Sequence, residues 1–307
     1  MTALSVPTWA WALLAVVLAA CLSIDLVAHR GDRVDSRRRA LAWSGVWVGA
    51  ALAFNGFVAV RFGAEAGEQF LAAYLLEKSL SIDNLFLFVV VFAALGIPAA
   101  EQRRVLTWGI VGALVTRALF IGLGVAALHR WHGLTYVFGA ILVITAVKLL
   151  RASGEPTKPR ILGWLERHLP WTSTLHGHHF VARVRGRWLG TPLLVALIAI
   201  ELTDLVFALD SIPAAFAVTE DTFILYSSNI FAVLGLRALF VVLAGALESL
   251  RHLRFGLAAV LAFAGAKMLL ASWIVVSPIA SVLVIVGCIG ATVVTSALAA
   301  QRERRAR

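Results

Sequence analysis

Charged residues are scarce in this chain of 307 residues, at 14%, whereas hydrophobic residues make up 61% of it. The mean hydropathy is +0.89. Soluble domains are typically about 45–50% apolar and about 25% charged. The composition therefore excludes a water-soluble globular enzyme, a disordered chain and a collagen-like chain.

Cysteine is nearly absent, and Cys21 and Cys288 both lie within apolar runs. Neither a disulfide framework nor a zinc site is therefore expected. The first 20 residues contain no lysine or arginine, which a signal peptide needs at its start. We interpret residues 18–21, Leu-Ala-Ala-Cys, as part of a first membrane helix rather than as a lipoprotein cleavage site. No His-Glu-x-x-His or Gly-x-Ser-x-Gly motif occurs, so we do not expect an enzyme.

Long apolar runs, by contrast, are abundant. A membrane-crossing helix needs about 20 apolar residues, and nine stretches meet this length. They lie at about 8–28, 40–60, 70–94, 105–128, 133–150, 191–218, 226–247, 253–274 and 278–299. We predict an all-α polytopic membrane protein with about nine transmembrane helices, forming a single transmembrane domain over residues 1–307.

Positive charge alternates from loop to loop along these spans. The loops on one side carry 20 arginine and lysine residues, and those on the other side carry two. The positive-inside rule then places the N-terminus outside and the C-terminus in the cytoplasm, together with the loop 151–190. This arrangement explains the net charge of +10 without nucleic acid. We expect the lipid bilayer as a partner; protein partners stay unknown.

An internal repeat joins two parts of the chain. Arg-Ala-Leu-Phe occurs at 117–120 and again at 237–240. A lysine follows and an aspartate precedes each copy, in a register shifted by about 120 residues. Three helices in each unit invert the second unit (191–274, helices 6–8) relative to the first (70–150, helices 3–5). Inverted repeats are typical of secondary transporters, with the substrate site near the midplane; the alternative is a duplication retained only for packing.

Ten ionisable residues fall inside the spans of the two repeats. The acids are Glu77, Asp83, Glu201, Asp204 and Asp210, and the bases are Lys78, Arg117, Lys148, Arg237 and Lys267. Each charge facing lipid would cost about 2.5–3.5 kcal/mol, so we expect them to face the bundle interior or water. We interpret the acids as ligands and the bases as counter-charges. The alternative is a set of ion pairs that only holds the bundle together.

The acids concentrate on two of the predicted helices. Glu77 and Asn84 lie seven positions apart, on one helix face. Pro213 is expected to break the helix 191–218 and to free the carbonyl of Leu209. Oxygen ligands suit Mn²⁺, Mg²⁺ or Ca²⁺. A histidine cluster in the cytoplasmic loop, at His176, His178 and His179, could capture a transition metal, although such runs are usually solvated.

The two acidic motifs resemble the TerC family of integral membrane proteins. The residues that carry the resemblance are Glu77 through Phe86, Glu201 through Pro213, Ser228 through Phe231, and Leu234 through Leu239. The resemblance implies a multi-pass protein of the plasma (inner) membrane. Some members of the family are linked to Mn²⁺ export, and others are named for tellurium resistance. The resemblance also implies metal binding by Glu77, Asp83, Asn84, Glu201, Asp204 and Asp210. For Asp25 we favour a helix-end carboxylate in water over a metal ligand.

These observations favour a secondary exporter of a divalent metal cation, Mn²⁺, which exchanges the metal for protons through the same carboxylates. We expect no permanently bound cofactor, with Mn²⁺ as the transported ion. The alternatives are an exporter of another small cation or of an amino acid, and a non-transporting membrane scaffold linked to metal or tellurite stress.

Overall fold

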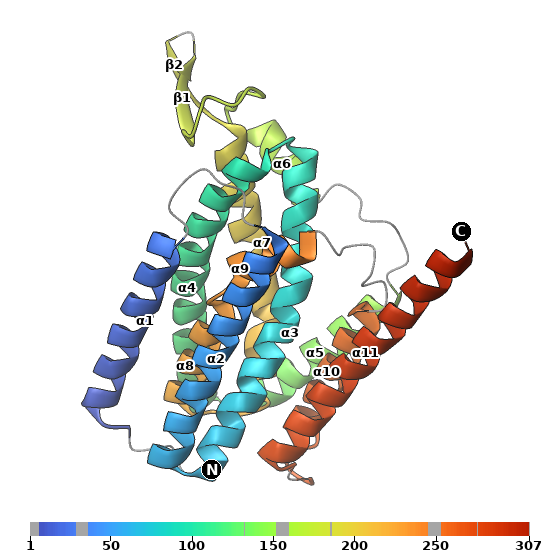
Figure 1. The fold of residues 1–307 in the computed structure, drawn as a ribbon. Helices are drawn as coiled ribbons and strands as arrows, with labels where there is room; N and C mark the ends of the chain where they lie inside the picture. The colour runs from blue at the N-terminus through green and yellow to red at the C-terminus, as the bar shows by residue number, and fades with distance from the viewer. Residues whose placement is uncertain are drawn as a thin grey trace.

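The computed structural model describes residues 6–28, 36–131, 133–151, 160–184, 186–244, 253–274 and 276–306, and most of them are helical (Figure 1). The helices are α1 (Thr8–Ala28), α2 (Arg37–Phe62), α3 (Ala64–Ala94), α4 (Ala99–Arg130), α5 (Leu134–Arg151), α6 (Arg160–His168), α7 (Pro192–Phe216), α8 (Thr222–Val233), α9 (Leu236–Ala244), α10 (Leu253–Leu269) and α11 (Pro278–Ala306). The strands are β1 (Val181–Val184) and β2 (Arg187–Gly190).

Seven helical stretches in the described residues are long and apolar enough to cross a membrane. They confirm the prediction of an all-α polytopic membrane protein. Helices α3 and α10 occupy the other two predicted spans, 70–94 and 253–274, but neither is among the seven stretches. Helix α3 is 31 residues long and carries five charged residues, and α10 has only 17 residues. The count of nine transmembrane helices therefore stays a prediction.

The predicted span 226–247 is not one helix, because the chain breaks between α8 and α9. Gly235 lies in this break with φ +80°, a conformation that favours glycine. A Cβ atom on Gly235 would lie 2.7 Å from Cδ1 of Trp47 on α2. Only a glycine therefore satisfies both the backbone conformation and the close approach of α2.

The expected break at Pro213 is wrong, since α7 runs without interruption through this residue to Phe216. Proline lacks one amide donor and disturbs only the turn before it. Pro213 lies in the last turn of α7, where its own carbonyl accepts a hydrogen bond from Ala217 N–H over 3.0 Å. The cost of the missing donor is small there, because the helix ends within the next turn.

The loop 151–190 contains α6 and an antiparallel β-hairpin that pairs Val181 with Gly190. Figure 1 shows the hairpin projecting from one end of the bundle, whereas α1 begins at the other end. Thr191 Oγ1 donates to the carbonyl of His179 over 2.7 Å. This bond ties the base of the hairpin to the first turn of α7.

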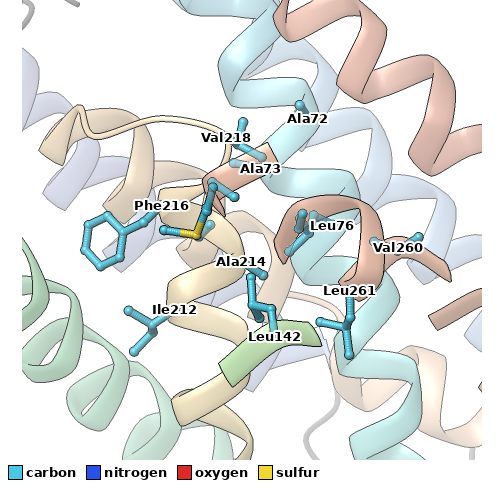
Figure 2. Packing of buried hydrophobic residues seen from close by; sticks show 14 of the residues in the cluster. Ala72, Ala73, Leu76, Leu142, Ile212, Ala214, Phe216, Val218, Val260 and Leu261 are labelled. Atoms are coloured by element: carbon cyan, nitrogen blue, oxygen red, sulfur yellow. The ribbon is translucent and has the colours of Figure 1, made fainter. Parts of the chain in front are cut away.

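The interior of the bundle is apolar on one side of α7. Figure 2 shows side chains from α3, α5, α7 and α10 packing together, among them Leu76, Leu142, Ile212 and Leu261. Helix α3 packs against α7 and α8, α4 against α7, and α5 against α10. This packing holds the acid-bearing segments of α3 and α7 next to each other, with α4 against α7.

Candidate functional site

One face of α3 carries three buried polar residues, Glu77, Ser81 and Asn84. Their spacing of four and three residues places them on the same side of the helix. Glu77 is 1% exposed, Ser81 0% and Asn84 4%. In the part of the chain that the structure describes, Glu77 Oε2 and Ser81 Oγ are enclosed without a hydrogen-bond partner. This face therefore presents free oxygen atoms to the bundle interior.

Arg117 of α4 reaches this face and is only 2% exposed. Its Nη1 atom forms a close ion pair with Glu77. Its Nη2 atom lies 3.0 Å from Oδ1 of Asp204 on α7, and its Nε donates to Oδ2 of Asp204 over 3.4 Å. One guanidinium thus bridges carboxylates from two helices. We call Glu77, Arg117 and Asp204 the arginine-bridged triad.

Two further groups border the triad. Asn84 Nδ2 donates to Oδ1 of Asp204 over 3.4 Å. Glu201, one turn before Asp204, places its carboxylate against Gly112 of α4, where a Cβ atom would overlap it. Glu201 Oε1 is enclosed and has no hydrogen-bond partner among the described residues. The glycine at position 112 therefore makes room for this carboxylate between α4 and α7.

A small cavity of about 20 Å³ lies beside the triad, lined in part by Asn84, Asp204 and Arg237. About 10–15 Å³ is enough to hold one water molecule, so this space suits one water or one bare metal ion. The triad itself has two acids and one base, which leaves a formal charge of −1. A buried excess charge is costly unless an ion or a further partner neutralises it.

The second repeated arginine, Arg237, has a different environment. Its Nη2 lies 3.1 Å from Oδ2 of Asp25 on α1 and donates to the carbonyl of Asp25 over 2.7 Å. Its Nη1 donates to Thr107 Oγ1 over 3.1 Å. The interpretation of Asp25 as a carboxylate in water is therefore wrong. The repeat could have indicated this pair, because a buried arginine at position 237 requires an acidic partner, as Arg117 does.

The three lysines predicted as counter-charges lie in different places. Lys78 Nζ donates to the carbonyls of Ala232 and Leu234, over 3.1 and 3.2 Å. Lys267 Nζ donates to Ser281 Oγ over 3.1 Å. Lys148 is exposed, in the last turn of α5. The structure thus places none of them in the triad.

Of the six predicted metal ligands, the structure brings Glu77, Asn84, Glu201 and Asp204 to the contact of α3, α4 and α7. Asp83 and Asp210 lie in α3 and α7, but their side chains are outside the described residues. No group of three or more His, Cys, Asp or Glu side chains that could hold a metal ion occurs within the described part. Metal binding therefore stays a prediction.

Two of the loop histidines, His176 and His178, contact other side chains. His178 Nδ1 lies 2.7 Å from Oε1 of Glu101, in the first turn of α4. His176 Nε2 lies 3.1 Å from Thr174 Oγ1. The first contact attaches the loop to α4, and the second lies within the loop. A role in metal capture stays a prediction.

The comparison with known families agrees with the residues described above. Residues 62–305 match the family described as "Integral membrane protein TerC family". The chain belongs to the TerC family. The match spans all the helices from α3 to α11, so it includes every residue of the arginine-bridged triad. Among solved structures there is no match.

Several relatives of this TerC family chain cover nearly its whole length. An "Uncharacterized membrane protein STKORF319" of Myxococcus xanthus is 49% identical over 290 residues, 93% of this chain and 91% of the relative. A "Putative membrane-bound redox modulator Alx" of Escherichia coli K12 is 41% identical over 311 residues, 97% of each. An "Uncharacterized membrane protein" of Rickettsia felis is 35% identical, over 89% of this chain and 92% of the relative.

Proposed function

We propose that this protein is a secondary transporter that exports a divalent metal cation, with Mn²⁺ as its substrate. The observation that carries the proposal is the arginine-bridged triad, in which two buried acids share one buried base. Intramembrane charges are rare and mark ion or substrate pathways. A divalent cation would supply the positive charge that the triad lacks.

The chemistry of the donor atoms supports this substrate. Asn84 and Asp204 offer amide and carboxylate oxygens at a cavity of about 20 Å³. Glu77 and Ser81 add buried carboxylate and hydroxyl oxygens on the same face of α3 as Asn84. Hard cations such as Mn²⁺ and Mg²⁺ prefer these ligands. A cation that binds here competes with Arg117 for the same two carboxylates. Loading of the site therefore requires the guanidinium to release Asp204 or Glu77.

The packing of the helices supports the inverted repeat. A two-fold axis that exchanges 70–150 with 191–274 exchanges α3 with α7, α4 with α8 and α9, and α5 with α10. The contact of α3 with α8 then corresponds to the contact of α4 with α7, and α5 with α10 corresponds to itself. All these contacts occur. The triad lies where the two repeats meet, which is the usual position of a transporter site.

A scaffold without transport would also contain buried ion pairs, and the name of the Alx relatives refers to redox modulation. In this chain Cys21 and Cys288 are free thiols on α1 and α11, away from the triad residues of α3, α4 and α7. We therefore propose transport through the carboxylates rather than redox chemistry at the thiols.

Purified protein in liposomes that contain a Mn²⁺-quenched dye tests this function. The wild-type protein should quench the dye when Mn²⁺ is added outside, and Glu77→Gln should not. Excess Zn²⁺ should compete weakly, because the site offers neither histidine nor cysteine. Empty liposomes are the control. A wild-type signal equal to that of empty liposomes would reject transport and favour the scaffold.

The orientation needs its own measurement. In a chain with both cysteines replaced by serine, Glu220→Cys should react with an impermeant reagent added to intact cells. Trp188→Cys in β2 should react only after the membrane is opened, because we expect the hairpin in the cytoplasm. Labelling of position 188 in intact cells would reverse the proposed orientation.

A further inference from the structure

The break between α8 and α9 leaves main-chain carbonyls without helical partners in the interior of the bundle. It lies inside an apolar stretch, Thr222–Val242, that is long enough to cross a membrane. The last four carbonyls of a helix have no partner within that helix, and a partner must come from elsewhere when water is excluded. The end of α8 therefore needs a donor or a cation.

Lys78 of α3 meets this need. Its ammonium nitrogen lies 3.1 Å from the carbonyl oxygen of Ala232 and 3.2 Å from that of Leu234. The C-terminal end of a helix carries a partial negative charge that favours a cation. The ammonium group thus satisfies two orphan carbonyls and also matches the electrostatics of the helix end.

The break is held in place from other sides as well. Trp47 of α2 packs against Gly235 so closely that a Cβ atom there would lie 2.7 Å from the indole. Arg237, two residues further, is anchored to Asp25 of α1 and Thr107 of α4. The carbonyls of Ala232 and Leu234 are therefore fixed by contacts that do not involve Lys78.

We propose that the end of α8 is a site for a monovalent alkali cation, such as Na⁺, that the tethered ammonium group of Lys78 fills in the native protein. Unwound carbonyls and the C-terminal ends of half-helices coordinate Na⁺ in secondary transporters. An ammonium group carries the same charge and binds the same oxygen atoms. With Lys78 present, the protein needs no inorganic ion here. The proposal is independent of Mn²⁺ transport, because it concerns the stability of the fold.

Two substitutions at position 78 separate a cation site from a simple hydrogen-bonded contact. Lys78→Ala removes the charge and opens the space, so that Na⁺ with bound water can enter. Lys78→Gln removes the charge but keeps donors within reach of the carbonyls. Lys267→Ala is the matched control, since Lys267 is also a partly buried lysine but contacts a serine hydroxyl.

The measurement is thermal unfolding of the purified full-length proteins in NaCl and in choline chloride of equal ionic strength. For the wild type, the melting temperature should be equal in the two salts. The same should hold for Lys267→Ala. Lys78→Ala should melt several degrees lower in choline chloride and regain stability as Na⁺ rises, as mass action requires for a bound ion. Lys78→Gln should depend on Na⁺ much less.

A Lys78→Ala protein with equal melting temperatures in the two salts would overturn the proposal. Purification of Lys78→Ala only when Na⁺ is present would support it. Failure of Lys78→Ala in both salts, with Lys78→Gln folded or not, would also overturn it, because Na⁺ then does not replace the ammonium group.

Discussion

The two repeated arginines have the same sequence context, Arg-Ala-Leu-Phe, and opposite environments. Arg117 bridges two acids, Glu77 and Asp204, in the centre of three packed helices. Arg237 meets one acid, Asp25, and the hydroxyl of Thr107. The first cluster therefore carries an excess negative charge, whereas the second pairs one acid with one base.

This difference separates a candidate transport site from a structural anchor. A buried pair of equal and opposite charges needs no further ion, and it breaks at considerable cost when one partner is removed. Two acids on one base remain attractive to a cation. The charge balance around each arginine, rather than the motif itself, therefore indicates where a metal ion would bind.

The largest effect is expected for Asp204→Asn, which makes the triad as neutral as the Arg237 cluster. Transport of Mn²⁺ into liposomes should fall by more than the roughly 10–100-fold that loss of an outer partner costs a metal site. The protein should still fold, since Arg117 keeps Glu77 and a buried amide costs less than an unpaired charge. Asp83→Asn, at the equivalent position of the first repeat, should behave alike. Poor insertion of both variants would instead favour the scaffold.

Arg117→Gln should have the next largest effect, on stability. It leaves Glu77 and Asp204 facing each other without a base, and breaking a buried pair typically costs about 3–5 kcal/mol. The yield of monodisperse protein in size-exclusion chromatography should drop sharply. Addition of Mn²⁺ should recover part of the melting temperature. Unaltered stability would show that the triad is not a charge-coupled unit.

Arg237→Gln tests the second arginine cluster, in which one base pairs with one acid. It leaves one unpaired acid, Asp25, whose side chain is 13% exposed, whereas Arg117→Gln leaves two acids that are 2% and 6% exposed. The melting temperature should therefore fall by less than in Arg117→Gln. Arg237 also borders the cavity beside Asp204. Loss of its positive charge should lower the Mn²⁺ concentration needed for half-maximal transport by several-fold. A weaker apparent affinity would contradict the assignment of the cavity to the cation.

The smallest effect is expected for Gly112→Ala, which keeps all charges and changes only the space for Glu201. A Cβ atom at this position would overlap the Glu201 carboxylate, and overpacking usually costs about 1–3 kcal/mol. Gly49→Ala on α2 is the control, because no atom lies within 4 Å of its added Cβ. The control should be neutral or slightly stabilised. Equal melting temperatures for the two variants would remove Glu201 from the α4–α7 contact.

Much of the fold follows from local properties of the chain. Apolar length placed helices at all nine predicted positions, and the acidic motifs pointed to the family that the comparison confirms. The predicted break at Pro213 in α7 does not occur, and the break at Leu234–Gly235, between α8 and α9, was not predicted. A proline near a helix end is tolerated, whereas Gly235 is required by the approach of Trp47 from another helix, which no local pattern reveals.

The sequence by itself determined that this protein is an α-helical membrane protein of the TerC family with charges inside its apolar spans, because span length and composition are properties of contiguous residues. Only the tertiary structure decided which charges meet: Arg117 with Glu77 and Asp204, Arg237 with Asp25, and Lys78 with the carbonyls of α8. The physical reason is that these partners are far apart in the chain, and their distances depend on how each helix is rotated and packed against its neighbours.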